Sequence, residues 1–140
     1  MFIGKYYHTL ESQGRVSLPK KMRDQSDTWV VTRGLDGGLF LYPLNAFESE
    51  ISKLQESSVT KKNNRDLVRI FSNEAVEVSP DKQGRVALPD YLIEFAGLGK
   101  DIVVVGSISK VELWDMKRYH AYAAELENQA EEIAEKYDAE

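Results

Sequence analysis

The sequence contains no cysteine in its 140 residues. This absence excludes disulfide bonds, cysteine nucleophiles and thiolate-ligated zinc or iron–sulfur centres. Long apolar stretches are also missing, since no run approaches the ~20 residues that a transmembrane helix requires. The first residues lack the basic and apolar regions of a secretory signal. We therefore expect a cytoplasmic protein without a membrane partner.

Enzyme signatures are missing as well. The chain contains no GxSxG, Walker, dinucleotide-binding GxGxxG or HExxH motif. His8 and His120 have no partner at metal-ligand spacing, and we expect both to be structural. The sequence therefore predicts a protein that is not an enzyme, and it indicates no catalytic residue, metal, cofactor or small-molecule substrate.

The charge of the chain is unevenly distributed. The net charge is −5, but residues 1–70 contain 11 Lys and Arg against 8 Asp and Glu, whereas residues 71–140 contain 7 against 15. The last twenty residues alone carry seven acids and one lysine. An acidic protein of this kind can still bind a nucleic acid, but we expect the footprint to lie on its N-terminal part.

An internal repeat organises the chain. Residues 11–19 (ESQGRVSLP) and 81–89 (DKQGRVALP) are identical at six of nine positions. Weaker similarity continues from Trp29–Thr32 to Asp101–Val104 and from Leu39–Tyr42 to Val111–Trp114. One unit therefore occurs twice in the chain.

Each unit is predicted to be mainly β-structure. A short strand leads into a glycine-containing turn, an alternating strand leaves it as in a tight hairpin, and a proline then suits the first turn of a short helix. A second hairpin follows in each unit. We place the strands at 8–10, 16–18, 29–32, 39–42, 76–78, 86–88, 102–105 and 111–114, and the short helices at 20–23 and 90–95.

The chain is expected to be an α+β protein whose two units, at residues 5–47 and 76–119, share one core as a pseudo-symmetric pair. Apolar residues at helical spacing predict helices in an insert at residues 48–75. The C-terminal segment, residues 120–140, is predicted to form an acidic helix with an apolar stripe. The stripe repeats every seven residues, at Tyr119, Leu126 and Ile133.

The sharpest motif is the tip of the first hairpin in each unit, formed by Glu11, Gly14 and Arg15 and by Asp81, Gly84 and Arg85. An acid and an arginine four residues apart can simply close the turn, with about 0–1 kcal/mol from an exposed ion pair. Spacing alone favours that interpretation. The alternative is that each rigid tip presents its arginine, and the second tip also Lys82, to an anionic partner. Two tips could then contact two points of a polymer.

Basic residues cluster in and around the first unit. They are either a solvated face or a surface that binds phosphates, in which arginine can also read guanine edges. The second unit has acids in comparable places, so we expect it to bind DNA less well. The predicted DNA-binding residues are Lys5, Arg15, Lys20, Lys21, Arg23 and Arg33.

Taken together, these motifs resemble the MraZ family. The residues that carry the resemblance are the start Met1–Gly4, the two tips, the paired GRV-x-LP strands, Arg65 and Arg69 in the insert, and Glu112–Trp114. The resemblance implies tandem SpoVT-AbrB-type units with swapped hairpins. It further implies that they form a pseudo-two-fold double-split β-barrel, with helices in the insert and at the C-terminus.

The resemblance also implies a function. Such a protein would be a nucleoid-associated, sequence-specific regulator of the bacterial division and cell-wall gene cluster, binding short direct repeats of double-stranded DNA in its own promoter as a homo-oligomeric ring. The family motif falls on Glu11 and Arg15 and on Asp81 and Arg85. Glu11 replaces the usual Asp, and we expect Arg15 to be presented nonetheless. Two alternatives remain open: an antitoxin-like module whose acidic C-terminal helix binds a protein partner, and a ring scaffold without a DNA role.

Overall fold

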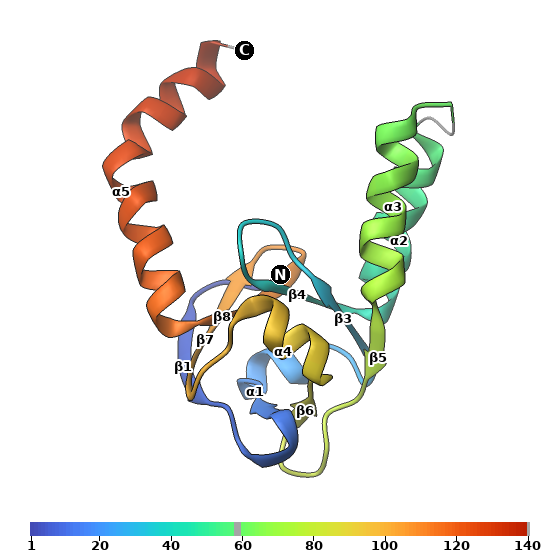
Figure 1. The fold of residues 1–140 in the computed structure, drawn as a ribbon, viewed down its shortest axis with the longest axis vertical. Helices are drawn as coiled ribbons and strands as arrows, with labels where there is room; N and C mark the ends of the chain where they lie inside the picture. The colour runs from blue at the N-terminus through green and yellow to red at the C-terminus, as the bar shows by residue number, and fades with distance from the viewer. Residues whose placement is uncertain (58–59, 140) are drawn as a thin grey trace.

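The computed structural model describes residues 1–57 and 60–139 in an α+β arrangement in which every strand pairing is antiparallel (Figure 1). The first half contains β1 (Lys5–Thr9), the 3-10 turn η1 (Ser12–Gly14), β2 (Arg15–Ser17), α1 (Lys20–Arg23), β3 (Trp29–Arg33), β4 (Leu39–Pro43), α2 (Leu44–Glu56) and α3 (Lys62–Glu74). The second half contains β5 (Val76–Val78), β6 (Arg85–Ala87), α4 (Asp90–Ala96), β7 (Asp101–Ser107), β8 (Lys110–Asp115) and α5 (Met116–Ala139).

The strands form a six-stranded sheet, in the order β1-β7-β8-β4-β3-β5, and a separate two-stranded ribbon of β2 and β6. The repeat makes β1, β2, β3 and β4 equivalent to β5, β6, β7 and β8. Exchanging equivalent strands reverses the order of the large sheet and leaves the ribbon unchanged. The strand order therefore has a pseudo-two-fold symmetry, with its axis between β4 and β8 and between β2 and β6.

The two units exchange strands. β1 pairs with β7, from Lys5 opposite Val105 to Thr9 opposite Asp101, and β5 pairs with β3. β2 and β6 pair with each other. Among the described residues, only the β3–β4 and β7–β8 ladders join strands of the same unit.

This exchange corrects one expectation from the sequence. The strands on either side of the first tip were expected to form a tight hairpin, but β1 and β2 belong to different sheets and share only an isolated bridge between Glu11 and Arg15. β1 and β2 still show the alternating burial that the sequence predicts, because one face of each strand packs against the common core. The backbone groups of β2 find their partners in β6, whose sequence is nearly the same.

The core lies between the six-stranded sheet and a layer made by the ribbon, α1 and α4. Val16 and Val86 are fully buried from the ribbon, and Trp29, Leu39 and Ile102 from the sheet. Pro19 and Pro89 precede α1 and α4, and their carbonyls accept the first helical hydrogen bonds. Both units thus contribute equivalent residues to one core.

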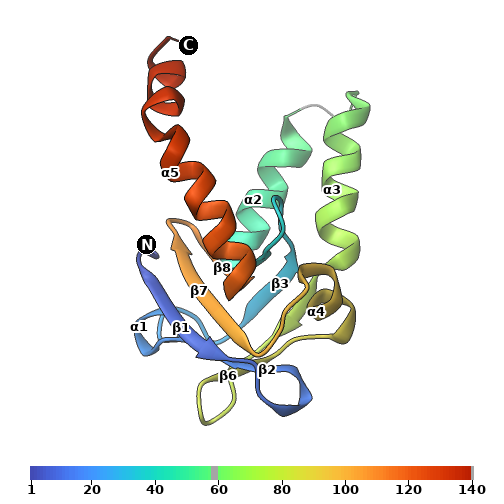
Figure 2. The same ribbon diagram turned by 60° about the vertical axis from the view of Figure 1, so that its left-hand side comes forward.

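Two helical arms project from the sheet, on the side away from the ribbon (Figures 1 and 2). One is the antiparallel pair of α2 and α3, of which α2 begins at Leu44, four residues before the start that the sequence analysis gave to the insert. The other is α5, which leaves β8 as a single helix. Equivalent aromatic pairs join the base of each arm to the sheet: the rings of Tyr42 and Phe47 lie 5.7 Å apart, as do those of Trp114 and Tyr119.

Candidate nucleic-acid interface

The two tips lie together at the end of the molecule opposite the arms (Figures 1 and 2). Each leads into one strand of the ribbon, η1 into β2 and residues 81–84 into β6. Two backbone bonds cross between the units at this end: Leu18 N–H donates to Gly84 O at 3.0 Å, and Leu88 N–H donates to Gly14 O at 2.8 Å. The tips are therefore held to each other, which gives this end of the molecule a fixed shape.

The register of the ribbon places both tip arginines on one face. Val16 lies opposite Val86, and both side chains point into the core. Because successive side chains alternate between the faces of a strand, their neighbours point outward. The outer face therefore carries Arg15, Ser17, Arg85 and Ala87, with Arg15 opposite Ala87 and Ser17 opposite Arg85.

The second tip is closed by its own acid. Asp81 Oδ1 accepts the backbone N–H groups of Gln83 at 2.9 Å and Arg85 at 3.0 Å, and Asp81 Oδ2 lies 3.0 Å from Arg85 Nε. The backbone bond from Arg85 holds the pKa of Asp81 below its usual value, followed by the bond from Gln83 and the Arg85 side chain. This carboxylate stays ionised and fixes the loop.

Arg85 bridges the two tips. Besides Asp81, its Nη1 lies 3.3 Å from Glu11 Oε1 of the other unit, and its side chain is only 20% exposed. Burial lowers the pKa of Arg85, but the hydrogen bonds and charges of Asp81 and Glu11 outweigh this effect and leave it raised. Arg85 is thus a permanently charged brace between the tips.

The first tip differs from what the spacing predicts. We expected Glu11 to pair with Arg15, four residues on, but its carboxylate reaches Arg85 instead. The longer glutamate side chain reaches across the interface of the two units, whereas the shorter Asp81 remains within its own turn. As a result the Arg15 side chain has no hydrogen bond or ion pair within the described residues, and it is half-buried on the outer face.

Glycine is required at both turns. Gly14 has φ +70°, and a Cβ there would lie 2.7 Å from the carbonyl oxygen of Leu88. Gly84 has φ +79°, and a Cβ there would lie 2.5 Å from Arg23 Nη1. The glycines predicted as parts of the motif thus permit the close approach of the two units as well as the left-handed backbone conformation.

The predicted basic residues of α1 divide into two kinds. Lys20 and Lys21 are exposed, and Lys20 pairs with Asp24 at 2.8 Å. Arg23 is half-buried instead: its Nη1 donates to Leu18 O at 2.8 Å, and its guanidinium covers Gly84. Arg23 therefore holds the second tip against the first unit.

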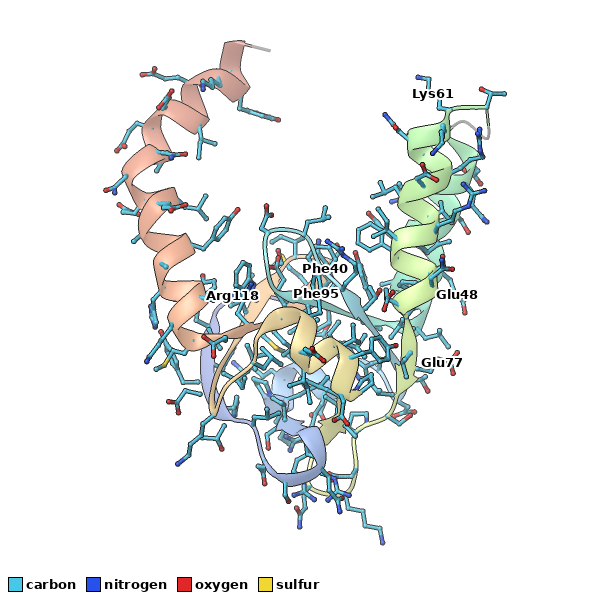
Figure 3. The ribbon with its side chains drawn as sticks, viewed as in Figure 1. Phe40, Glu48, Lys61, Glu77, Phe95 and Arg118 are labelled. Atoms are coloured by element: carbon cyan, nitrogen blue, oxygen red, sulfur yellow. The ribbon has the colours of Figure 1, made fainter. Side chains whose placement is uncertain are left out.

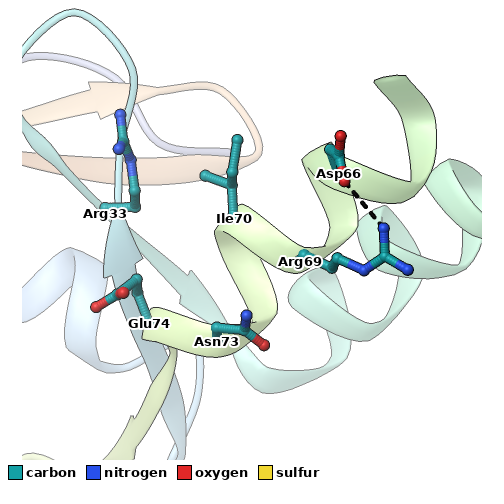
Figure 4. Close-up of a pocket in the computed structure, with 6 residues that line it drawn as sticks. All are labelled: Arg33, Asp66, Arg69, Ile70, Asn73 and Glu74. Carbon is teal, nitrogen blue, oxygen red and sulfur yellow. Dashed lines mark hydrogen bonds and ion pairs between the residues drawn. The ribbon is translucent and has the colours of Figure 1, made fainter. Parts of the chain in front are cut away.

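The structure does not bring all six predicted basic residues together. Lys5 is exposed at the start of β1, the end of that strand away from the tip. Arg33 ends β3, where its guanidinium lies 4.5 Å from the centre of the Phe95 ring. Figure 4 shows Arg33 beside α3, where it lines a shallow pocket with Ile70, Asn73 and Glu74.

The tips also carry a lysine that is not among the six predicted DNA-binding residues. Lys82 is exposed at the second tip, next to Asp81, and adds a positive charge there. The motif indicated it as a cation that this tip could present to an anionic partner. The first tip has Ser12 at the equivalent position and lacks this charge.

The described residues contain no group of three or more His, Asp or Glu side chains arranged to hold a metal ion. None of the helices described, α5 included, combines the length and the apolar character needed to cross a membrane.

Comparison with known proteins identifies the class to which this tandem-repeat fold belongs. Residues 1–70 and 71–139 each match the family described as "MraZ protein, putative antitoxin-like". The chain is 42% identical over 135 residues to the transcriptional regulator MraZ of Halothermothrix orenii, covering 96% of this chain and 94% of the relative.

Two further relatives agree. The transcriptional regulator MraZ of Pediococcus pentosaceus is 44% identical over 136 residues, covering 96% of this chain and 95% of the relative. That of Ligilactobacillus salivarius is 43% identical over 136 residues, with the same coverage. The chain belongs to the MraZ family, as the resemblance of its motifs indicated.

Proposed function

We propose that this protein is a transcriptional regulator that binds double-stranded DNA with the outer face of its β2–β6 ribbon and the two tips. One observation carries the proposal: within the described part of the chain, the Arg15 side chain on that face has no hydrogen bond or ion pair, whereas the neighbouring Arg85 is already neutralised by two acids. The regulators named among its relatives support the same function.

The geometry suits the major groove. A two-stranded antiparallel ribbon can enter that groove, and an arginine can bind the O6 and N7 atoms of guanine with two hydrogen bonds. Lys20, Lys21 and Lys82 are exposed around the ribbon and would neutralise phosphates. In this proposal Arg15 reads bases, the lysines supply most of the salt-sensitive affinity, and Arg85 and Arg23 position the tips.

The finer parts of the proposal follow the family resemblance. The two units, at residues 5–47 and 76–119, are AbrB-type units of a double-split barrel, and the exchange of β1 and β5 supports this assignment. The protein acts in the cytoplasm on the nucleoid and regulates its own division and cell-wall gene cluster. Several copies form a ring, in which successive protomers bind successive direct repeats and raise the affinity by ~10²–10⁴.

The test is binding to the organism's own division-cluster promoter, compared with a scrambled fragment at two salt concentrations. We expect preferential, salt-sensitive binding by the wild type. Arg15→Ala should weaken promoter binding by about 5- to 150-fold, which corresponds to the loss of a bidentate contact of about 1–3 kcal/mol. Lys136→Ala, on the exposed end of α5, should have no effect, and equal losses in the two variants would refute the proposed interface.

A second function is favoured by the family description and by the exposed acidic α5. In an antitoxin-like module, α5 would bind a basic partner protein while the ribbon binds DNA. Removal of residues 120–140 would then release a co-purifying protein and leave DNA binding intact.

A further inference from the structure

A small cavity lies between the α2–α3 arm and the sheet. Its volume is about 230 Å³, which exceeds the ~150 Å³ that is enough for a benzene molecule in an apolar protein cavity. Figure 3 shows one of its lining residues, Phe40, on the side of the arm that faces α5. Most of the lining is apolar and includes Phe40, Phe47, Ile51, Leu54 and Leu67. The cavity can therefore enclose the apolar part of a small molecule.

Tyr42 brings an unused hydroxyl group to this cavity. The residue is only 6% exposed, yet its hydroxyl has no hydrogen bond among the residues that the structure describes. Every fully enclosed side-chain N or O atom in that part of the chain has a partner, so the Tyr42 hydroxyl must reach the surface, and it does so where Tyr42 lines the cavity. Burial, and then the charges of Glu50 and Glu112, raise the pKa of Tyr42 to about 12. The hydroxyl therefore keeps its proton and can donate it in a hydrogen bond.

Two opposite charges line the same cavity. Lys110 Nζ lies 4.7 Å from the centre of the Phe40 ring and 5.8 Å from the centre of the Tyr42 ring. Glu50 comes from α2 and is exposed, and its charge acts on the Tyr42 hydroxyl. Lys110 and Glu50 do not pair with each other, and neither side chain has a hydrogen bond or ion pair within residues 1–57 and 60–139. A base and an acid are thus both available around one hydroxyl group.

The equivalent place in the second unit is satisfied by the protein itself. Trp114 is the counterpart of Tyr42 in the repeat. Its Nε1 donates to Glu112 Oε1 at 2.9 Å, and the ring of Tyr122 stacks on it with the ring centres 5.3 Å apart. The fold therefore does not require an open polar group at this position. The open hydroxyl of the first unit is specific to its cavity, and it points to a ligand.

We propose that this cavity binds an α-amino acid with a large apolar side chain. That side chain enters the cavity, the ligand carboxylate binds Lys110 and the Tyr42 hydroxyl, and the ligand ammonium group binds Glu50. Charge selects a zwitterion, because a simple acid would face Glu50 unpaired and a simple amine would leave Lys110 unpaired. The ligand contacts α2, α3 and the sheet together, so the site couples the arm to the concentration of an amino acid. This effector function goes beyond the proposed DNA binding and does not depend on it.

Isothermal titration calorimetry of the full chain with four probes tests the chemistry of the ligand. L-Phenylalanine carries all three recognised groups, whereas hydrocinnamate lacks the ammonium group, phenethylamine lacks the carboxylate and glycine lacks the apolar side chain. We expect L-phenylalanine to bind at least about tenfold more tightly than each of the other three, because a lost hydrogen bond to a charged group has an effect of this size.

Three variants of the full chain assign each ligand group to its residue. Lys110→Met should bind L-phenylalanine no better than phenethylamine, and Glu50→Gln should bind it no better than hydrocinnamate. Tyr42→Phe should weaken L-phenylalanine about tenfold and leave phenethylamine unchanged. The binding that each variant retains shows that it is folded. Matched controls at exposed positions outside the cavity, which should bind L-phenylalanine as the wild type does, are Lys117→Met, Glu48→Gln and Tyr7→Phe.

Several results would overturn the proposal. The first is a wild type that does not bind L-phenylalanine at millimolar concentration. The second is equal binding of hydrocinnamate or phenethylamine, which would show that the cavity does not select a zwitterion. The third is a set of variants that keep the discrimination of the wild type, or that lose no more affinity than their matched controls. None of these measurements contains DNA, so their outcome is independent of promoter binding.

Discussion

At the residue scale, the acids of the two tips differ by one methylene group, and this difference changes the partner of each. Asp81 is short enough to accept two backbone N–H groups of its own loop, while Glu11 extends to Arg85 of the other unit. The consequence is an uneven distribution of charge on the ribbon face, since Arg85 faces two carboxylates and Arg15 faces none within the described residues. Two copies of one motif thus offer one available arginine, and their backbones differ too, since Gln13 has φ +62° in the first tip only.

The role of Glu11 can be tested by shortening it. In Glu11→Asp the carboxylate should no longer reach Arg85 and should close its own turn, as Asp81 does, thereby pairing with Arg15. We expect promoter binding to fall several-fold, while the free energy of unfolding changes by less than about 1 kcal/mol, because the Glu11 carboxylate is at the surface and exchanges one arginine partner for another. Fluorescence anisotropy and urea unfolding measure the two effects. Unchanged DNA affinity would show that the availability of Arg15 does not limit binding.

The ionisation of Asp81 predicts a pH dependence. Its pKa is lowered in the folded protein, first by the backbone bond from Arg85, so the carboxylate stabilises the fold above its unfolded pKa of about 3.9. This contribution is lost as the pH falls through the lower, folded pKa. The stability difference between wild type and Asp81→Asn should therefore be constant near neutral pH and should shrink as the pH falls below about 4. Asp138→Asn, on the exposed end of α5, is the control and should show a small difference throughout.

The glycines of the two turns predict unequal consequences of the same substitution. In Gly14→Ala the new Cβ meets a backbone oxygen of Leu88, which cannot move without breaking the contact between units, so we expect a loss of about 1–3 kcal/mol in urea unfolding. In Gly84→Ala it meets the flexible side chain of Arg23. Arg23→Ala should therefore relieve part of the Gly84→Ala effect and none of the Gly14→Ala effect. Equal coupling in both pairs would contradict this explanation.

At the scale of the elements, each unit depends on the other for its strands. Within the described residues β1 pairs only with β7, and β2 only with β6, so the first unit alone keeps the single β3–β4 ladder. An isolated two-stranded hairpin is at best marginally stable in water. We expect a fragment of residues 1–57 to be unfolded, or folded only as a homodimer that exchanges its own strands. Circular dichroism and sedimentation check this, and a folded monomeric fragment would contradict it.

The same exchange explains which parts of the fold could be predicted from the sequence. Alternation and the repeat place every strand within a few residues, and β5 was placed at Val76–Val78 as observed. They do not identify the partner of a strand, because β1 and β7 are a hundred residues apart and alternation is satisfied by any pairing that buries the same face. A tight hairpin between β1 and β2 would also satisfy the alternation, but in the structure β1 pairs with β7 and β2 pairs with β6.

The candidate site shows a similar division. Arg15 was predicted from the repeated motif and its exposure on the ribbon follows from alternation. The contact from Glu11 to Arg85 depends on the distance between two units, and no local spacing encodes that distance. The hydrogen bond from Arg23 to Leu18 O and the contact of its guanidinium with Gly84 could not be predicted from the sequence for the same reason.

At the scale of the whole molecule, the ribbon and the two arms lie at opposite ends (Figure 1). DNA binding by one protomer should therefore be separable from assembly. The contacts of the proposed ring should lie on the arms, where Leu126 and Ile133 are exposed apolar side chains on one face of α5. Leu126→Asp/Ile133→Asp should therefore bind a duplex with a single promoter repeat as the wild type does. On a duplex with several repeats it should lose the ~10²–10⁴-fold gain that linked sites provide. Ala124→Asp/Asn128→Asp, which adds the same charge on the opposite face of α5, should keep that gain, and equal losses on both duplexes would show that the two ends are coupled.

The pairing of β1 with β7 also determines the order of events during synthesis of the chain. The ribosome releases Lys5 first and its partner Val105 a hundred residues later. At about 5–20 residues per second, β1 waits roughly 5–20 s before its ladder can form. During that interval the nascent chain holds β1 unpaired, and it leaves exposed the preceding Phe2, which the finished core buries. Slow translation of the second unit should therefore expose this protein to chaperones and to aggregation more than an equally long chain of local hairpins.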